Sequence, residues 1–143
     1  MAAMMSIHAP NQLSDQARLP ERVLWALAQE RRPLGVYQLA QKLTSATGHP
    51  HHPNSIYRVL HALLGRGVVL QVASAKGWIV RARDGDGATI VMVCRDCGCA
   101  EQIPAGAVEG DLDAVVATTR FKPSLYHFEV IGHCRACADR TPG

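Results

Sequence analysis

Four of the five cysteines in this 143-residue chain form two Cys-x-x-Cys pairs, the first at Cys94 and Cys97 and the second at Cys134 and Cys137. A Cys-x-x-Cys turn places two thiolates on one side of a tight loop. Two such turns that face each other supply the four sulfur ligands suited to tetrahedral Zn²⁺. We therefore predict a zinc site formed by these four cysteines.

Four protein thiolates leave no coordination position for water or substrate, so the predicted zinc is structural, with one Zn²⁺ per subunit. Its binding energy would stabilise the fold around it. The alternatives are a thioredoxin-like redox dithiol and unrelated buried cysteines. A redox motif needs only one pair at the start of a helix, whereas here both pairs follow a predicted strand. We find neither an open coordination site nor a nucleophile–base pair, so we predict no catalytic residues and no enzyme.

Three residues adjoin the cysteine pairs, namely Gly98, Cys99 and Gly132. Gly98 and Gly132 flank the pairs, where a glycine can adopt the positive φ that such turns often need. Cys99 is left over, and we interpret it as a spectator thiol, with a redox or metal role as the alternative.

The elements that must position the cysteines lie in an acidic half, residues 84–143, which contains nine of the 12 Asp and Glu residues. The pattern predicts a strand over 89–93, a helix over 106–119 and a strand over 125–131, and each strand leads into a cysteine pair. We expect residues 84–143 to form a zinc-stabilised dimerisation domain. Asp-Gly pairs at 84–87 favour a turn at its boundary.

Residues 1–83 contain ten of the 15 Lys and Arg residues and have a different pattern. Apolar spacing predicts helices from Leu19 to before Arg32, from Val36 to Leu43, and from Pro53 to Gly65 or Gly67, with a polar connection over 44–52. The runs 68–72 and 78–80, joined by a turn at 74–77, form a plausible hairpin. Three helices and a hairpin outline a winged helix-turn-helix DNA-binding domain, with residues 1–17 expected to be mobile. The predicted fold class is α+β in two domains.

The third predicted helix has a polar face opposite its apolar stripe. Asn54, Tyr57, Arg58 and His61 lie on it, and these side chains can contact base edges and phosphates. The alternative is a solvated helix face, but the basic half and the winged-helix outline favour DNA. Arg18, ahead of the first helix, and Lys76, at the hairpin tip, are further predicted DNA contacts.

With these residues in view, the chain resembles the ferric uptake regulator family, and most closely its zinc uptake regulator branch. The family's recognition-helix pattern appears as Pro53-Asn54-Ser55-Ile56-Tyr57-Arg58-Val59-Leu60, which adds Ser55 to the DNA-binding set, and its cysteine pattern appears at 93–98 and 132–137. The match runs from about residue 18 to 137. The resemblance implies a homodimeric metalloregulator whose winged helix binds an inverted-repeat operator in double-stranded DNA and whose second domain dimerises around a structural zinc.

The resemblance also implies a second, regulatory metal site near the hinge, and there this sequence departs from the family. Its ligand positions fall on Leu70, Arg81, Gly87 and Gln102, none of which is the expected ligand. A sensing site of the usual kind is therefore not expected. Other side chains remain open as substitutes, namely Asp84, Asp86, Glu101, His127, His133, His49, His51 and His52.

The sequence has no apolar run near the ~20 residues that span a bilayer, and its N-terminus lacks the features of a secretory signal. We expect a cytoplasmic protein with no membrane association. The function that fits best is a transcription regulator, expected to be a repressor in metal homeostasis, with an atypical or missing sensing site. The alternative is a zinc-stabilised protein-interaction adaptor that kept the fold without metal-gated DNA binding.

Overall fold

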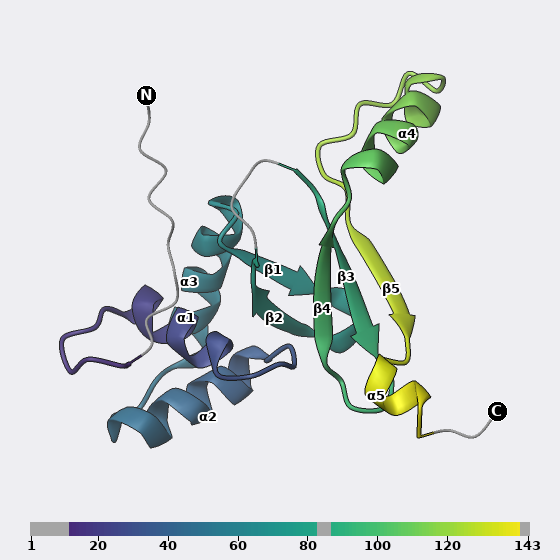
Figure 1. The fold of residues 1–143 in the computed structure, drawn as a ribbon. Helices are drawn as coiled ribbons and strands as arrows, with labels where there is room; N and C mark the ends of the chain where they lie inside the picture. The colour runs from purple at the N-terminus through teal and green to yellow at the C-terminus, as the bar shows by residue number, and fades with distance from the viewer. Residues whose placement is uncertain (1–11, 83–86, 141–143) are drawn as a thin grey trace. The chain divides into compact units, whose positions relative to one another are not determined.

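A computed structural model describes residues 12–82 and 87–140 of the chain (Figure 1). The chain divides into two compact units, residues 1–84 and 85–143. The turn expected at 84–87 lies largely outside the described residues, as do residues 1–11 of the segment expected to be mobile. No helix among the described residues is long and apolar enough to cross a membrane.

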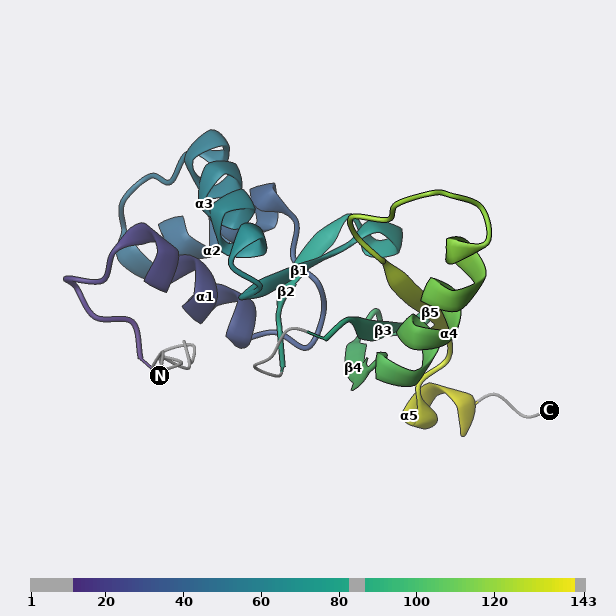
Figure 2. The same cartoon turned by 90° about the horizontal axis from the view of Figure 1, so that it is seen from above.

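The described residues of the first unit, 12–82, form three α-helices, α1 (Leu19–Ala28), α2 (Val36–Thr47) and α3 (Pro53–Gly65), which pack around one core (Figure 2). The predicted apolar stripes form this core. Leu39, Leu43, Ile56 and Leu60 are fully buried in it. Each helix therefore keeps its opposite face for solvent or a partner.

A two-stranded hairpin follows α3. Strand β1 (Val69–Val72) pairs antiparallel with β2 (Gly77–Val80), and the short helix η1 (Ala73–Ala75) joins them. Lys76 takes a left-handed φ of 49° at the end of this connection, so the chain reverses there. The three helices and the hairpin confirm the predicted winged-helix fold class.

The described residues of the second unit, 87–140, form a three-stranded sheet and two helices. Its strands are β3 (Thr89–Cys94), β4 (Ala100–Pro104) and β5 (Phe128–Gly132), in the order β4-β3-β5. β3 pairs antiparallel with β4 and parallel with β5. Helix α4 (Gly106–Ala117) follows β4 at one end of the sheet, and helix α5 (Arg135–Ala138) follows β5 at the other end, as Figure 1 shows.

The structure differs from the prediction at two boundaries and in one additional strand. α2 extends to Thr47, into the predicted polar connection over 44–52, and ends there because Gly48 adopts a positive φ of 74°. The predicted strand at 125–131 begins only at Phe128. The prediction of strand, helix and strand also omitted β4, whose polar sequence has little apolar alternation and which forms because β3 supplies its hydrogen-bonding partners.

Candidate metal centre and nucleic-acid interface

The parallel pairing of β3 with β5 brings the two cysteine pairs together. In this register Cys94, the last residue of β3, pairs with Gly132, the last residue of β5. Parallel strands end at the same edge of a sheet, so the loop after β3 and the turn after β5 emerge side by side. The backbone N–H of Arg95 donates to the carbonyl of Gly132 at 2.8 Å and ties the two together.

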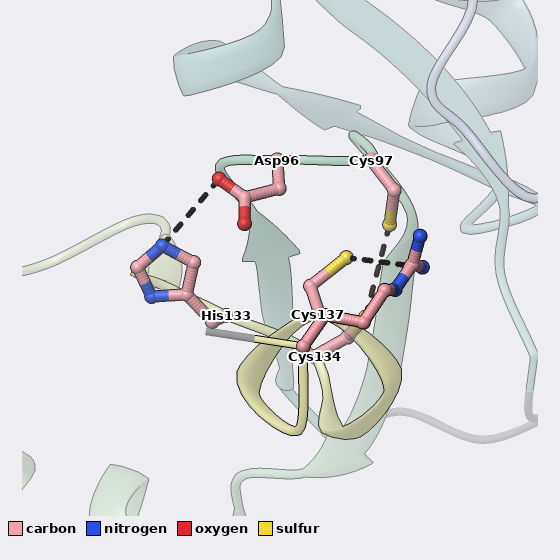
Figure 3. A network of polar contacts seen from close by, with 6 residues as sticks. Asp96, Cys97, His133, Cys134 and Cys137 are labelled. Carbon is pink, nitrogen blue, oxygen red and sulfur yellow. Dashed lines mark hydrogen bonds and ion pairs between the residues drawn. The ribbon is translucent and has the colours of Figure 1, made fainter. Parts of the chain in front are cut away.

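The four predicted ligands, Cys94, Cys97, Cys134 and Cys137, form one cluster whose sulfur atoms all lie within 4.8 Å of one another. Cys97 Sγ and Cys134 Sγ are 3.8 Å apart (Figure 3). In a tetrahedral zinc site with Zn–S bonds of about 2.3 Å, neighbouring sulfur atoms are about 3.8 Å apart. The donor set and its spacing therefore fit Zn²⁺.

Backbone hydrogen bonds shape both turns. The N–H of Gly98 donates to the carbonyl of Cys94 at 3.0 Å, and the N–H of Ala138 donates to the carbonyl of Cys134 at 2.8 Å. Gly98 has a φ of 75°, as the sequence predicts for one flanking glycine. Gly132 does not adopt a positive φ, because it is the last residue of β5, so that part of the prediction is wrong.

The thiols of the cluster differ in acidity. Hydrogen bonds from the backbone at Cys134 and Cys97 lower the pKa of Cys94 to about 6, while the neighbouring thiol of Cys134, with burial, raises the pKa of Cys137 to about 12. Close thiolates repel one another, so without a cation the four groups cannot all ionise at neutral pH. A bound Zn²⁺ would supply the positive charge that holds all four as thiolates.

Three polar side chains, His133, Asp96 and Arg140, border the cluster. His133 Nε2 lies 3.6 Å from an Asp96 carboxylate oxygen, and Figure 3 shows the imidazole directed away from the sulfur atoms. Arg140 Nη2 donates to Cys137 Sγ at 3.8 Å. No role for Arg140 was predicted from the sequence. Its position three residues after Cys137 places the two side chains close together where the helical turn continues past Cys137.

Cys99 is half-buried and stands beside the cluster without being one of the four. Hydrogen bonding to Cys97, followed by burial, raises its pKa to about 12, which makes it a poor nucleophile. The interpretation of Cys99 as a spectator thiol stays a prediction.

Helix α3 presents the predicted nucleic-acid face. Ile56, Leu60 and Leu63 are buried, and the predicted DNA-binding residues of the helix are exposed, namely Asn54, Ser55, Tyr57, Arg58 and His61. Pro53 lies in the first turn, where no intrahelical N–H is needed. The face is thus available to a partner.

Two of these side chains belong to a chain of ring contacts. The rings of Tyr57 and His61 have centroids 4.3 Å apart, and the His61 ring meets Trp78 of β2 edge-on at 5.5 Å. Trp78 is buried, so the polar face of α3 is connected by ring contacts to the hairpin core. The sequence carried no signal for this contact beyond the four-residue spacing of Tyr57 and His61.

The two outlying predicted contacts are also exposed. Arg18 precedes α1, and its backbone N–H donates to a Glu21 carboxylate oxygen at 3.0 Å. Lys76 lies between β1 and β2 at the tip of the hairpin. Both side chains face solvent in the first unit.

The substitute ligands for a second metal are scattered. His51 lies against Arg22, with Nε2 3.4 Å from Nη1, and His127 pairs with Glu129 at 3.4 Å. Asp84 and Asp86 lie outside the described residues. Within either unit, the described residues contain no further group of three or more close metal-ligating side chains.

Neither a protein-family model nor a curated protein sequence matches the chain. Solved structures do. A zinc uptake regulator in complex with zinc and DNA matches at 23% identity with a TM-score of 0.80, covering 86% of this chain and 83% of that one. The holo form of XcZur matches at 23% identity with a TM-score of 0.77, covering 86% of each chain.

The Helicobacter pylori ferric uptake regulator Fur matches more distantly, at 17% identity with a TM-score of 0.58, covering 85% of this chain and 81% of that one. Together these similarities show that the chain has the fold of the zinc and ferric uptake regulators. The resemblance identified from the recognition-helix and cysteine patterns is confirmed at the level of the fold.

Proposed function

We propose that this chain is a DNA-binding transcription regulator of the zinc uptake regulator branch, acting as a homodimeric repressor. One observation carries the proposal: the motif residues Tyr57 and Arg58 are exposed on the third helix of a winged-helix unit, in a chain that also holds a four-cysteine cluster. A solved zinc uptake regulator with this fold is bound to zinc and DNA, which supports both ligands here.

In this proposal α3 lies in the major groove of an inverted-repeat operator. Arg58 would contact guanine or phosphate, Asn54 adenine, and the Tyr57 ring a thymine methyl group. Ser55, Arg18 and Lys76 would contact the backbone, and such phosphate contacts supply most of the affinity while base contacts supply specificity.

Cys94, Cys97, Cys134 and Cys137 would hold one structural Zn²⁺ per subunit. The ion would cross-link the loop after β3 to α5 and stabilise the second unit. That unit has few buried side chains of its own, chiefly Val91 and Val93 of β3 together with two of the cysteines.

The second unit also carries the surface expected of a subunit interface. α4 contains no buried residue, and most of the exposed large apolar side chains of the described chain lie in this unit, namely Ile103, Val108, Val115, Phe121, Leu125, Val130 and Ile131. Exposed apolar groups gathered on a unit with a small core indicate a protein–protein contact. A second copy of the chain is the occupant we propose, and the dimer would set the spacing of the two operator half-sites.

The response to a regulatory metal is proposed to be altered or lost. At the family's positions for the sensing ligands, Leu70 and Gly87 offer no ligating side chain and Arg81 is cationic. DNA binding would then depend on the structural zinc and not on a second ion.

The test is binding to a duplex selected by the wild-type protein from a randomised pool, measured with and without added Zn²⁺, Fe²⁺ or Mn²⁺. Arg58→Ala should abolish specific binding and leave the dimer and its zinc intact. The control Arg31→Ala removes the same charge from an exposed position outside α3, and this variant should retain specific binding. Failure to select any duplex, with a stable zinc-bound dimer, would favour the interaction adaptor instead.

A further inference from the structure

His61 belongs to a chain of ring contacts that joins Tyr57 to Trp78. His61 lies between a half-exposed ring and a buried one: the exposed fraction of Tyr57 is 51% and that of Trp78 is 3%. The contacts are 4.3 Å to Tyr57, tilted at 54°, and 5.5 Å to Trp78, edge to face at 74°. Both lie in the range of favourable aromatic pairs.

The backbone of Trp78 is held in place by contacts within the first unit. Its N–H donates to the carbonyl of Leu34 at 2.8 Å, and its carbonyl accepts from the N–H of Leu34 at 3.0 Å. The preceding Gly77 leaves no room for a side chain, since an added Cβ would lie 2.9 Å from Pro33. The Trp78 backbone is therefore held from both sides, and the His61 ring contacts a buried side chain on this fixed backbone.

Tyr57 has the opposite situation, because it extends into solvent one helical turn before His61. An exposed tyrosine on a helix populates several rotamers, and immobilising such a side chain on binding costs conformational entropy. The neighbouring imidazole covers one side of the ring and removes part of that freedom before a partner arrives.

We propose that His61 is a positioning residue, which transmits the fixed geometry of Trp78 to Tyr57 and so orients the tyrosine ring for its base contact. The inference rests on the proposed function, because it assigns Tyr57 to DNA. It moves His61 from the set of direct contacts to a supporting place behind Tyr57.

Three substitutions separate the two roles. His61→Phe keeps a ring between Tyr57 and Trp78 but removes both nitrogen atoms, whereas His61→Asn keeps a polar group and removes the ring. His61→Ala removes both. A positioning role predicts that Phe retains affinity for the selected duplex while Asn and Ala each lose about fivefold, the worth of an aromatic pair. A direct contact predicts the reverse order for Phe and Asn, which would overturn the proposal.

The salt dependence of binding gives a second readout. Loss of a phosphate contact lowers the slope of log K against log salt by about 1. His61→Ala should leave the slope unchanged and should not weaken binding to a scrambled duplex. A reduced slope would show that His61 contacts phosphate and would refute the positioning role.

Measurements on the DNA-free protein distinguish failure of this inference from failure of the proposed function. In NMR spectra without DNA, the imidazole C–H protons of His61 should show ring-current shifts that Tyr57→Ala changes and Tyr57→Phe retains. If Tyr57→Ala leaves them unchanged, the ring contact is absent and the inference fails, while Arg58→Ala still tests DNA binding. If the ring contact is present but no duplex is selected, the proposed function fails and the positioning role falls with it.

Discussion

Cys97 Sγ and Cys134 Sγ lie 3.8 Å apart although 37 positions separate the two residues in the sequence. The parallel pairing of β3 with β5 produces this proximity, since it ends both strands at one edge of the sheet. The cluster therefore depends on the sheet, and we expect the sheet to depend on the metal bound to the cluster.

Replacing one ligand tests this mutual dependence. Cys94→Ser should lose zinc and unfold residues 85–143, because an incomplete thiolate set binds Zn²⁺ weakly and the small core of this unit cannot compensate. Zinc content and far-UV circular dichroism measure the two effects. Cys99→Ser is the matched control and should keep both, since Cys99 is not one of the four clustered thiols. A Cys94→Ser protein that stays fully folded would refute a structural role for the metal.

Acidification should release the zinc. In the metal-free site Cys137, with a pKa near 12, is protonated at neutral pH, so Zn²⁺ binding must displace its proton. Cys94 has a pKa of about 6 and is largely ionised above that value; as the pH falls through 6 it takes up a further competing proton. Zinc affinity should therefore fall as the pH decreases, and more steeply below pH 6. A chromophoric chelator titration at several pH values measures this, and a pH-independent affinity would contradict it.

Metal stoichiometry tests the proposed loss of the sensing site. Purified protein should contain about one tightly held Zn²⁺ per chain, which is the capacity of a single four-thiolate site. After equilibration with Zn²⁺, Fe²⁺ or Mn²⁺ and removal of free ion, elemental analysis should find no second equivalent. A second, exchangeable ion held with high affinity would show that other ligands replace the family's usual set.

The sequence was sufficient for the parts of this molecule that local pattern determines. Ile56, Leu60 and Leu63 follow the helical period, so α3 and its exposed face could be predicted, and the spacing within each cysteine pair predicted the ligands. β4 could not be predicted, because residues such as Glu101 and Gln102 become a strand only through pairing with β3. The contact of His61 with Trp78 depends on how α3 packs against the hairpin, which no local pattern encodes.

The close packing at Gly77 predicts a sensitive position in the hairpin. In Gly77→Ala the new Cβ would lie 2.9 Å from Pro33 backbone and side-chain atoms, so the hairpin must shift. We expect a loss of about 1–3 kcal/mol in the free energy of unfolding, by analogy with overpacked cores. Gly65→Ala at the end of α3 is the control, because nothing lies within 4 Å of its added Cβ. Urea denaturation measures both, and equal stability of the two variants would show that the hairpin relaxes freely.

The uncovered apolar side chains of the second unit predict where the interface of the proposed dimer lies. Val115 of α4 is 64% exposed and Val130 of β5 is 54% exposed, and neither supports the core of its own unit. If a second copy covers them, Val115→Asp or Val130→Asp would bury an unpaired charge in the interface, which costs several kcal/mol and should yield monomers with bound zinc.

Tyr37→Asp is the control, because Tyr37 is 80% exposed on α2 in the other unit, and it should leave the dimer intact. Sedimentation equilibrium gives the subunit count. Operator affinity should fall in variants that lose dimerisation, because each subunit then binds its half-site independently, without the effective concentration that a joined pair supplies. Dimers that persist in both valine variants, with unchanged affinity, would move the interface to another surface.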